Sequence, residues 1–156
     1  MAAGTWKMMN NAKLKLGAGT MVLSGAFRMA LFTSASNLKT AASAKPLLLL
    51  QSVSNPVTEQ FGYCSSGKAI GAEVWAVGAN ASTMHFDFTT LGVKWSANGG
   101  TISGIRYAAI FQSAVASANS FMLCYVTLTT SPLALADTNT LTVKPSATGI
   151  FTLGGM

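Results

Sequence analysis

The fold class is decided by residues 83–89, which read TMHFDFT. Apolar and polar residues alternate along this stretch, so Met84, Phe86 and Phe88 would share one side of an extended chain. A period of two residues is typical of a β-strand with one face in the core and the other in water. Residues 83–89 therefore predict a half-buried β-strand.

The same alternation recurs along most of the chain after residue 20. At 26–32 it places Phe27, Met29 and Leu31 on one face and Arg28 on the other. Further strands are expected at 70–77, 121–128, 139–144 and 148–153. About eight short strands separated by turns are typical of an antiparallel sandwich or barrel, so we expect an all-β, jelly-roll-like β-sandwich.

A hairpin is the clearest local prediction. The strand-like runs 93–97 and 101–111 are separated by Asn98-Gly99-Gly100. Asn and Gly adopt the positive φ angles of tight turns at little cost, so the two runs are expected to pair with each other. Residues 35–50 do not alternate, and Pro46 would interrupt a helix there, so we expect a loop with a short helical turn.

Charge divides the chain into two unequal parts. Residues 1–58 contain six basic residues and no acid, whereas residues 59–156 contain four basic and four acidic residues. A neutral body with a basic leading segment predicts binding to an acidic surface. We expect a basic N-terminal arm at 1–19, extended until it meets a partner, and a single β-sandwich domain at 20–156.

The expected partner contacts come from the basic part of the chain. A tryptophan supplies a large apolar anchor, and basic side chains orient the partner and raise the association rate. The expected contact residues are Trp6, Lys7, Lys13, Lys15 and Arg28. Nucleic acid is disfavoured as the partner, because the chain has only two arginines and the lysine stripe is short.

The surface carries few charges. Charged residues make up 9% of the chain and apolar residues 50%, whereas roughly a quarter of an ordinary soluble domain is charged. An uncharged strand such as 120–130 is prone to edge-to-edge pairing, so we expect a homodimer or homotrimer that covers it. Polar residues interrupt the uncharged stretch 107–136 too often for a membrane-spanning segment, and no membrane association is expected.

Residues 62–68, GYCSSGK, match the first seven positions of a phosphate-binding loop. The eighth position requires a hydroxyl for magnesium but is Ala69, and no strand–loop–helix unit surrounds the stretch. Ser65 and Lys68 also match the S-x-x-K pattern of penicillin-binding enzymes, whose partner motifs are absent. A turn between strands is the favoured interpretation.

Other catalytic and metal-binding candidates are few. One histidine, two cysteines and four acids are too few for a converging zinc site. His85 and Asp87 lie two positions apart on one predicted strand face, where a hydrogen-bonded surface pair is the favoured interpretation over a catalytic dyad. We expect no catalytic residue, no metal and no cofactor.

Several stretches resemble small virion structural proteins of tailed bacteriophages. Residues 13–20, KLKLGAGT, and 27–37, FRMALFTSASN, resemble the opening of these proteins. Pieces within 62–69, 95–108 and 141–151 follow in the same order. The resemblance implies a β-sandwich of this size that serves as a capsid decoration, or cement, protein, although others of the group lie on tails or fibres.

The expected function is therefore that of a non-enzymatic decoration protein on the capsid surface of the virion. Its partners would be the major capsid protein and other copies of itself. Three alternatives stay open: a tail- or fibre-associated structural protein, a nucleic-acid-binding protein and, ranked last, an enzyme. The enzyme would use Ser65 with Lys68, or His85 with Asp87.

Overall fold

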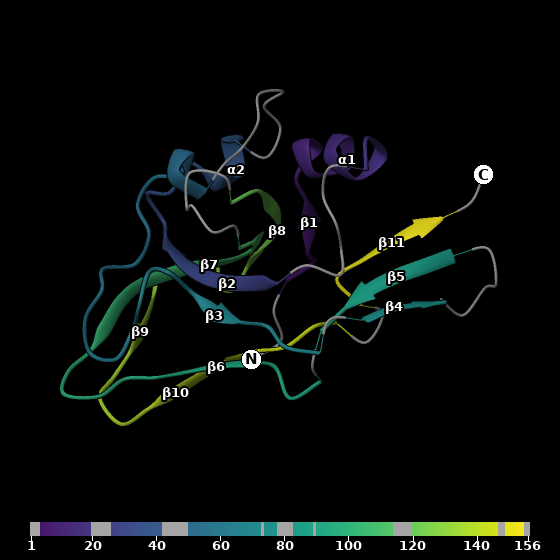
Figure 1. The fold of residues 1–156 in the computed structure, drawn as a ribbon. Coiled ribbons are helices and arrows are strands. Elements are labelled where there is room, and N and C mark those ends of the chain that lie inside the picture. The colour runs from purple at the N-terminus through teal and green to yellow at the C-terminus, as the bar shows by residue number, and fades with distance from the viewer. Residues whose placement is uncertain are drawn as a thin grey trace.

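The chain is built almost entirely of antiparallel β-strands (Figure 1). The computed structural model describes residues 4–19, 26–41, 50–72, 74–77, 83–88, 90–113, 120–146 and 149–154. Every strand pairing among them is antiparallel, and the helices are short. The predicted all-β fold class is confirmed.

The elements follow one another in a simple order along the chain. The strands are β1 (Lys7–Met8), β2 (Phe27–Thr33), β3 (Lys68–Ala69), β4 (Val74–Val77), β5 (Thr83–Asp87), β6 (Val93–Ser96), β7 (Ile102–Gln112), β8 (Met122–Thr127), β9 (Leu133–Leu135), β10 (Thr140–Val143) and β11 (Phe151–Gly154). The helices are α1 (Asn10–Gly17), α2 (Leu38–Ala41) and the 3-10 helix η1 (Leu50–Ser52).

The largest sheet has six strands and is centred on β7. Its order is β1-β8-β7-β2-β3, and β9 pairs with the first part of β7. The eleven residues of β7 pair with β2 along one edge and with β9 and then β8 along the other. Gly104, at φ 76°, lies where the register shifts between Ile102 and Ile105. Glycine adopts this left-handed conformation without a steric cost, so it permits the bulge.

Two smaller sheets complete the structure. One pairs β10 with β6, and the other has the order β11-β5-β4. The rings of Phe27 on β2 and Phe86 on β5 meet edge to face, with 5.4 Å between their centroids. Trp95 on β6 is completely buried. The aromatic side chains therefore join the small sheets to the core of the large one.

The central strands of the large sheet are buried on both faces. The residues Met122 to Val126 of β8 are all buried, as are four consecutive residues of β2, Met29 to Phe32. The helices α1 and α2 lie on one side of this sheet and β6 and β10 on the other (Figure 1). A strand that is covered on both sides has no polar face, which explains why Ala30 and Phe32, on the face of β2 opposite Met29 and Leu31, are buried as well.

Most predicted strands are present at the expected places. The stretches 26–32, 83–89, 121–128, 139–144 and 148–153 contain β2, β5, β8, β10 and β11, and the second half of 70–77 forms β4. The region 35–50 contains the short helix α2 and the first residue of η1, as expected for a loop with a helical turn. Residues 42–49, including Pro46, lie outside the described residues.

The predicted hairpin between 93–97 and 101–111 is wrong. The strand β6 pairs with β10, so that Trp95 faces Leu141 rather than a residue of β7. Gly99, at φ 80°, does form a turn, but its N–H donates to the carboxylate of Asp137, at 2.8 Å. The chain after the turn pairs with β9 instead, because Ile102 lies opposite Leu135. The Asn98-Gly99-Gly100 sequence correctly predicts a turn, but it does not show which strand pairs with β6.

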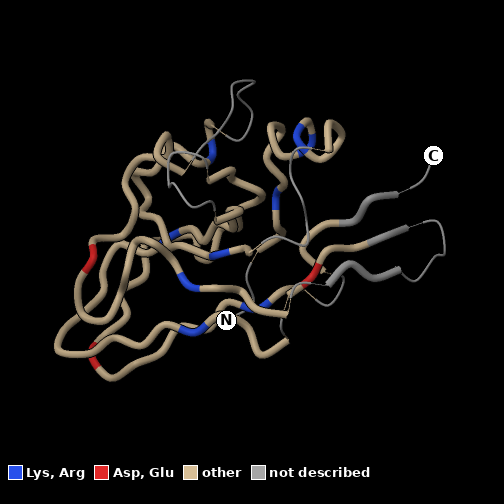
Figure 2. The backbone as a smooth tube through the Cα atoms, viewed as in Figure 1, with Lys and Arg blue, Asp and Glu red and all other residues tan. Residues whose placement is uncertain are grey.

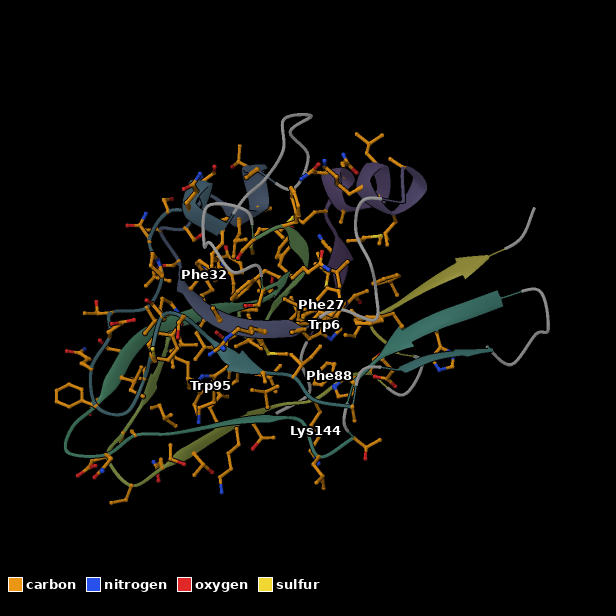
Figure 3. All side chains as sticks on the ribbon, viewed as in Figure 1. Trp6, Phe27, Phe32, Phe88, Trp95 and Lys144 are labelled. Carbon is orange, nitrogen blue, oxygen red and sulfur yellow. The ribbon has the colours of Figure 1, made fainter. Side chains whose placement is uncertain are left out.

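The N-terminal residues are part of the fold, which differs from the expected extended arm. Lys7 and Met8 pair with Tyr125 and Cys124 of β8. Trp6 is only 6% exposed, and its ring meets Phe88 edge to face at 6.3 Å. Figure 3 shows Trp6, Phe27 and Phe88 close together at the centre of the molecule. A large aromatic ring is stabilised by leaving water, so Trp6 packs into the core and is not a surface anchor.

The strand β8 is not an edge strand. It lies between β7 and β1, and the pairing continues beyond β1 on either side. The N–H of Gly4 donates to the Thr127 carbonyl at 3.1 Å, and the N–H of Met9 to the Leu123 carbonyl at 3.0 Å. The expectation that 120–130 exposes an unpaired edge was therefore wrong, because the N-terminal residues cover that edge.

Substitution of Trp6 tests whether the N-terminus belongs to the core. We expect Trp6→Ala to lower the free energy of unfolding by about 3–5 kcal/mol, since the change leaves a cavity beside Phe88. The matched control is Leu14→Ala, because Leu14 is 65% exposed and its loss should change stability by less than about 0.5 kcal/mol. Urea denaturation measures both. Equal stabilities of the two variants would mean that Trp6 is not packed in solution.

Candidate partner-binding surface

The helix α1 is held on the outside of the large sheet by its N-terminal half. It starts after Met9, whose backbone is extended and whose side chain is completely buried. Asn11 and Ala12, in the first turn of the helix, are buried, and the helix contacts β8. The helical period then turns Lys13 and Leu14 outward. Lys13 and Leu14 of the sequence KLKL are thus exposed, because the preceding turn faces the core.

The outward residues form what we call the α1 surface: Lys7, Lys13, Leu14 and Lys15. Lys7 and Lys13 are exposed, and Leu14 is 65% exposed. Lys15 is half-buried, and its ammonium lies 4.9 Å from the centre of the Phe121 ring. A cation over an aromatic face is attracted by the ring electrons, so the ammonium of Lys15 already interacts with a group of the protein itself. Lys7 and Lys13 therefore offer the more accessible charges.

No acid lies near this surface in the sequence, and the acids of the described residues are held elsewhere. Figure 2 shows basic but no acidic segments on β1, α1 and α2. Three described carboxylates each accept a backbone N–H: Glu59 from Ser65, Asp87 from Phe88, and Asp137 from Gly99 and Thr138. The positive potential of the α1 surface is therefore not neutralised by acids of its own segment.

A pocket of about 300 Å³ opens beside the α1 surface. The described residues that line it are Met8 from β1 and Lys13, Leu16 and Gly17 from α1. Sequence analysis missed Met8, Leu14, Leu16 and Gly17 as candidate contacts. The repeated apolar residues between the lysines were the available signal, but only the placement of α1 shows which of them face outward.

Three of the five predicted contact residues lie on the consecutive elements β1 and α1, and two do not. Lys7, Lys13 and Lys15 belong to β1 and α1, whereas Trp6 is in the core. Arg28 lies on β2 and is bound to the loop that precedes β3. Its Nε donates to the Ser66 carbonyl at 2.8 Å, and its Nη2 donates to the Gly67 carbonyl at 2.6 Å. Arg28 therefore holds this loop and does not belong to the α1 surface.

The loop 59–68 does not have the structure of a phosphate site. The Glu59 carboxylate accepts the N–H of Ser65 at 2.8 Å and also the Ser65 hydroxyl. The bond from the Ser65 side chain, followed by that from its backbone, lowers the pKa of the Glu59 carboxyl. A carboxylate thus takes the donor that a phosphate would need, and its charge would repel an anion. The Lys68 ammonium points away from the loop, to the Lys94 carbonyl at 2.9 Å.

The same hydrogen bonds argue against a catalytic role for the S-x-x-K match. A second pocket lies beside this loop. Ser65 donates to Glu59, and Lys68 donates to a backbone carbonyl, so the two are not paired as nucleophile and base. A pocket of about 410 Å³ lies beside Ser65 and Ser66 and is otherwise lined mainly by apolar residues and Gln51. The loop is a turn between strands that is tied down by its own carboxylate, as the favoured interpretation predicted.

Tyr63 anchors this loop to β2. Its hydroxyl accepts the N–H of Leu31 at 2.9 Å and donates to the Leu31 carbonyl at 3.1 Å. The side chain is buried, and burial raises the pKa of Tyr63 to about 12. Ionisation of this hydroxyl would place a charge in the interior and remove the bond that it donates.

The raised pKa of Tyr63 makes stability depend on alkaline pH. Because the pKa is higher in the folded state than its usual value of about 10, the neutral group stabilises the fold below pH 10. That stability should be lost as the pH rises from about 10 to 12, by roughly 2–3 kcal/mol. The control is Tyr63→Phe, which is less stable at neutral pH but should lose less between these pH values. Parallel pH dependences, measured by urea unfolding, would contradict the assignment.

Other candidates for chemistry do not converge. The Asp87 carboxylate accepts the Phe88 N–H at 2.8 Å. Among the described residues, no three His, Cys, Asp or Glu side chains lie close enough to hold a metal ion. Both cysteines are free thiols: Cys64 is exposed, whereas Cys124 is buried and burial raises its pKa.

Comparisons with known proteins do not add a family to this geometry. No protein-family model, curated protein or solved structure matches the chain. Within the described residues, no helix has the length and apolar character needed to cross a membrane. In the described part of the chain, the α1 surface is the feature that best indicates a function.

Proposed function

We propose that this protein is a non-enzymatic structural protein of a tailed-bacteriophage virion. In the simplest form of the proposal it is a capsid decoration, or cement, protein that binds the outer shell of the major capsid protein and stabilises it. The observation that carries the binding role is the α1 surface, where exposed lysines and an exposed leucine belong to one segment without acids. The virion assignment is supported by the sequence resemblance of 13–20 and 27–37.

The binding surface of this proposal is preformed. We expected an arm that orders on docking, whereas β1 and α1 are already fixed by pairing with β8 and by the burial of Trp6 and Met9. A surface that is ordered before binding does not lose the conformational entropy of an arm when it docks. The positive charge then steers the approach to an acidic shell, and Leu14 contributes apolar contact area once the surfaces meet.

The arrangement of the sheets is part of the same proposal. We propose a jelly-roll-like sandwich in which the six-stranded sheet forms one layer and the two smaller sheets form the other. The contact between Phe27 and Phe86 and the complete burial of Trp95 support two facing layers. A packed sandwich would act as a rigid body that transmits force between the capsid subunits it joins.

Charge reversal on the α1 surface tests the binding role. The variant carries Lys7→Glu and Lys13→Glu, and its control carries Lys94→Glu and Lys144→Glu. All four lysines are exposed, and both variants have the same net charge. Figure 3 shows Lys144 on the opposite side of the molecule from α1. We expect the first variant to bind capsid shells at least about tenfold more weakly than the wild type and the control to stay within about twofold.

The binding is measured by co-sedimentation with shells that lack the protein, with tails and double-stranded DNA in parallel. Equal losses in the two variants would show that only net charge matters and would contradict the assignment of the surface. Binding to tails alone would support the tail- or fibre-associated alternative. Binding to DNA alone, with an affinity that falls steeply with salt, would replace the proposal by a nucleic-acid-binding function.

Self-association as a homodimer or homotrimer is also proposed. Since β8 is covered, the contact would have to use another edge, such as that of the small sheet β11-β5-β4. We expect light scattering to give two or three times the mass of the 156-residue chain at high concentration. A stable monomer over the whole concentration range would contradict this part of the proposal.

A further inference from the structure

The pocket beside the α1 surface combines apolar walls with one lysine. Among the described residues that line it, Met8, Leu16 and Gly17 present apolar atoms, and Lys13 is exposed. Met8 and Leu16 are half-buried and pack against the hydrophobic core, so the floor of the pocket is fixed. Its volume of about 300 Å³ is at the lower limit for pockets that bind small molecules. Such a pocket accommodates one side chain better than a whole cofactor.

The charge around the pocket determines which residue type is favoured next to the inserted side chain in the partner's sequence. Lys13 lies at the pocket itself, and Lys7 and Lys15 belong to the adjoining α1 surface. A carboxylate next to an inserted apolar side chain would meet an ammonium group, whereas a lysine or arginine there would be repelled. The combination therefore fits an acidic protein segment with an apolar residue.

The lining disfavours a nucleic-acid base. Single-stranded nucleic acids bind through aromatic rings or arginine planes on which the bases stack. Of the described residues that line the pocket, none is aromatic or an arginine. The ring of Phe121, near α1, has the Lys15 ammonium over its face at 4.9 Å. That face is therefore occupied by a cation of the protein itself.

We propose that the pocket binds one apolar side chain, such as leucine, from a partner protein segment in which an adjacent residue is Asp or Glu, and that this carboxylate pairs with Lys13. The inference rests on the proposed function, because it states which feature of the partner the α1 surface recognises. Met8, Leu16 and Gly17 hold the apolar side chain, and Lys13 selects the acid beside it.

Gly17 offers a way to close the pocket without disturbing the fold. A Cβ atom added at Gly17 would meet no heavy atom within 4 Å, and the residue lies at the end of α1, where most side chains favour the helix more than glycine does. Gly17→Leu should therefore fill the pocket in a folded protein. Gly17→Ala is the matched control, since it adds one methyl group and leaves most of the space open.

The probe is a fluorescently labelled peptide of nine residues with one leucine between two aspartates in a glycine–serine background. Fluorescence anisotropy with the full chain measures its affinity. We expect Gly17→Leu and Lys13→Gln each to weaken binding at least about tenfold and Gly17→Ala to change it less than about threefold. Replacement of the peptide leucine by alanine, or of both aspartates by asparagine, should cause similar losses. The methyl resonance of Met8 should shift on titration.

The outcomes separate the pocket from the wider function. No binding of the peptide by the wild type, or equal binding by Gly17→Leu, overturns the pocket proposal. If Gly17→Leu still binds capsid shells like the wild type, the pocket is excluded while the decoration function stands. If the peptide binds through the pocket but the wild type binds neither shells nor tails, the virion function fails instead. Displacement of the peptide by a single-stranded oligonucleotide, unaffected by Gly17→Leu, would assign the surface to nucleic acid and also overturn the proposal.

Discussion

Backbone pairing along both edges of β7 is the constraint on which the rest of the structure depends. The strand aligns β2 on one side and β9 and β8 on the other, so segments from distant parts of the sequence share one sheet. The outer edge of β8 is then closed by β1, which carries Trp6 into the core and fixes the start of α1. The position of the lysines on α1 is thus a consequence of strand pairing that begins at β7, two strands away from β1 in the same sheet.

The local structure was largely predictable, because it depends on residues that are close in sequence. Alternation located the strands β2, β5, β8, β10 and β11, and the glycines marked turns. The partner of each strand was not predictable, as Trp95 shows: it lies opposite Leu141, which is more than forty positions away in the sequence. Pairing over such separations is decided by the packing of the whole core, which no local pattern records.

The binding surface shows the same division. The excess of lysine in the first segment was visible as composition, and Lys7, Lys13 and Lys15 do lie on the consecutive elements β1 and α1. Trp6 and Arg28 were assigned to the same surface because they are also near the N-terminus. However, Trp6 is buried in the core, and Arg28 is hydrogen-bonded to the loop before β3. Composition indicated what kind of partner to expect, whereas only the fold determines which side chains are available to meet it.

The two thiols have a practical consequence. Cys64 and Cys124 are the only cysteines of the chain; Cys64 is exposed, whereas Cys124 is buried and burial raises its pKa. A thiol-reactive reagent should therefore modify Cys64 selectively in the folded protein. Cys64 belongs to the loop before β3 and not to α1, so a gold cluster or fluorophore attached there would report the position of the molecule on a particle while leaving the α1 surface unmodified.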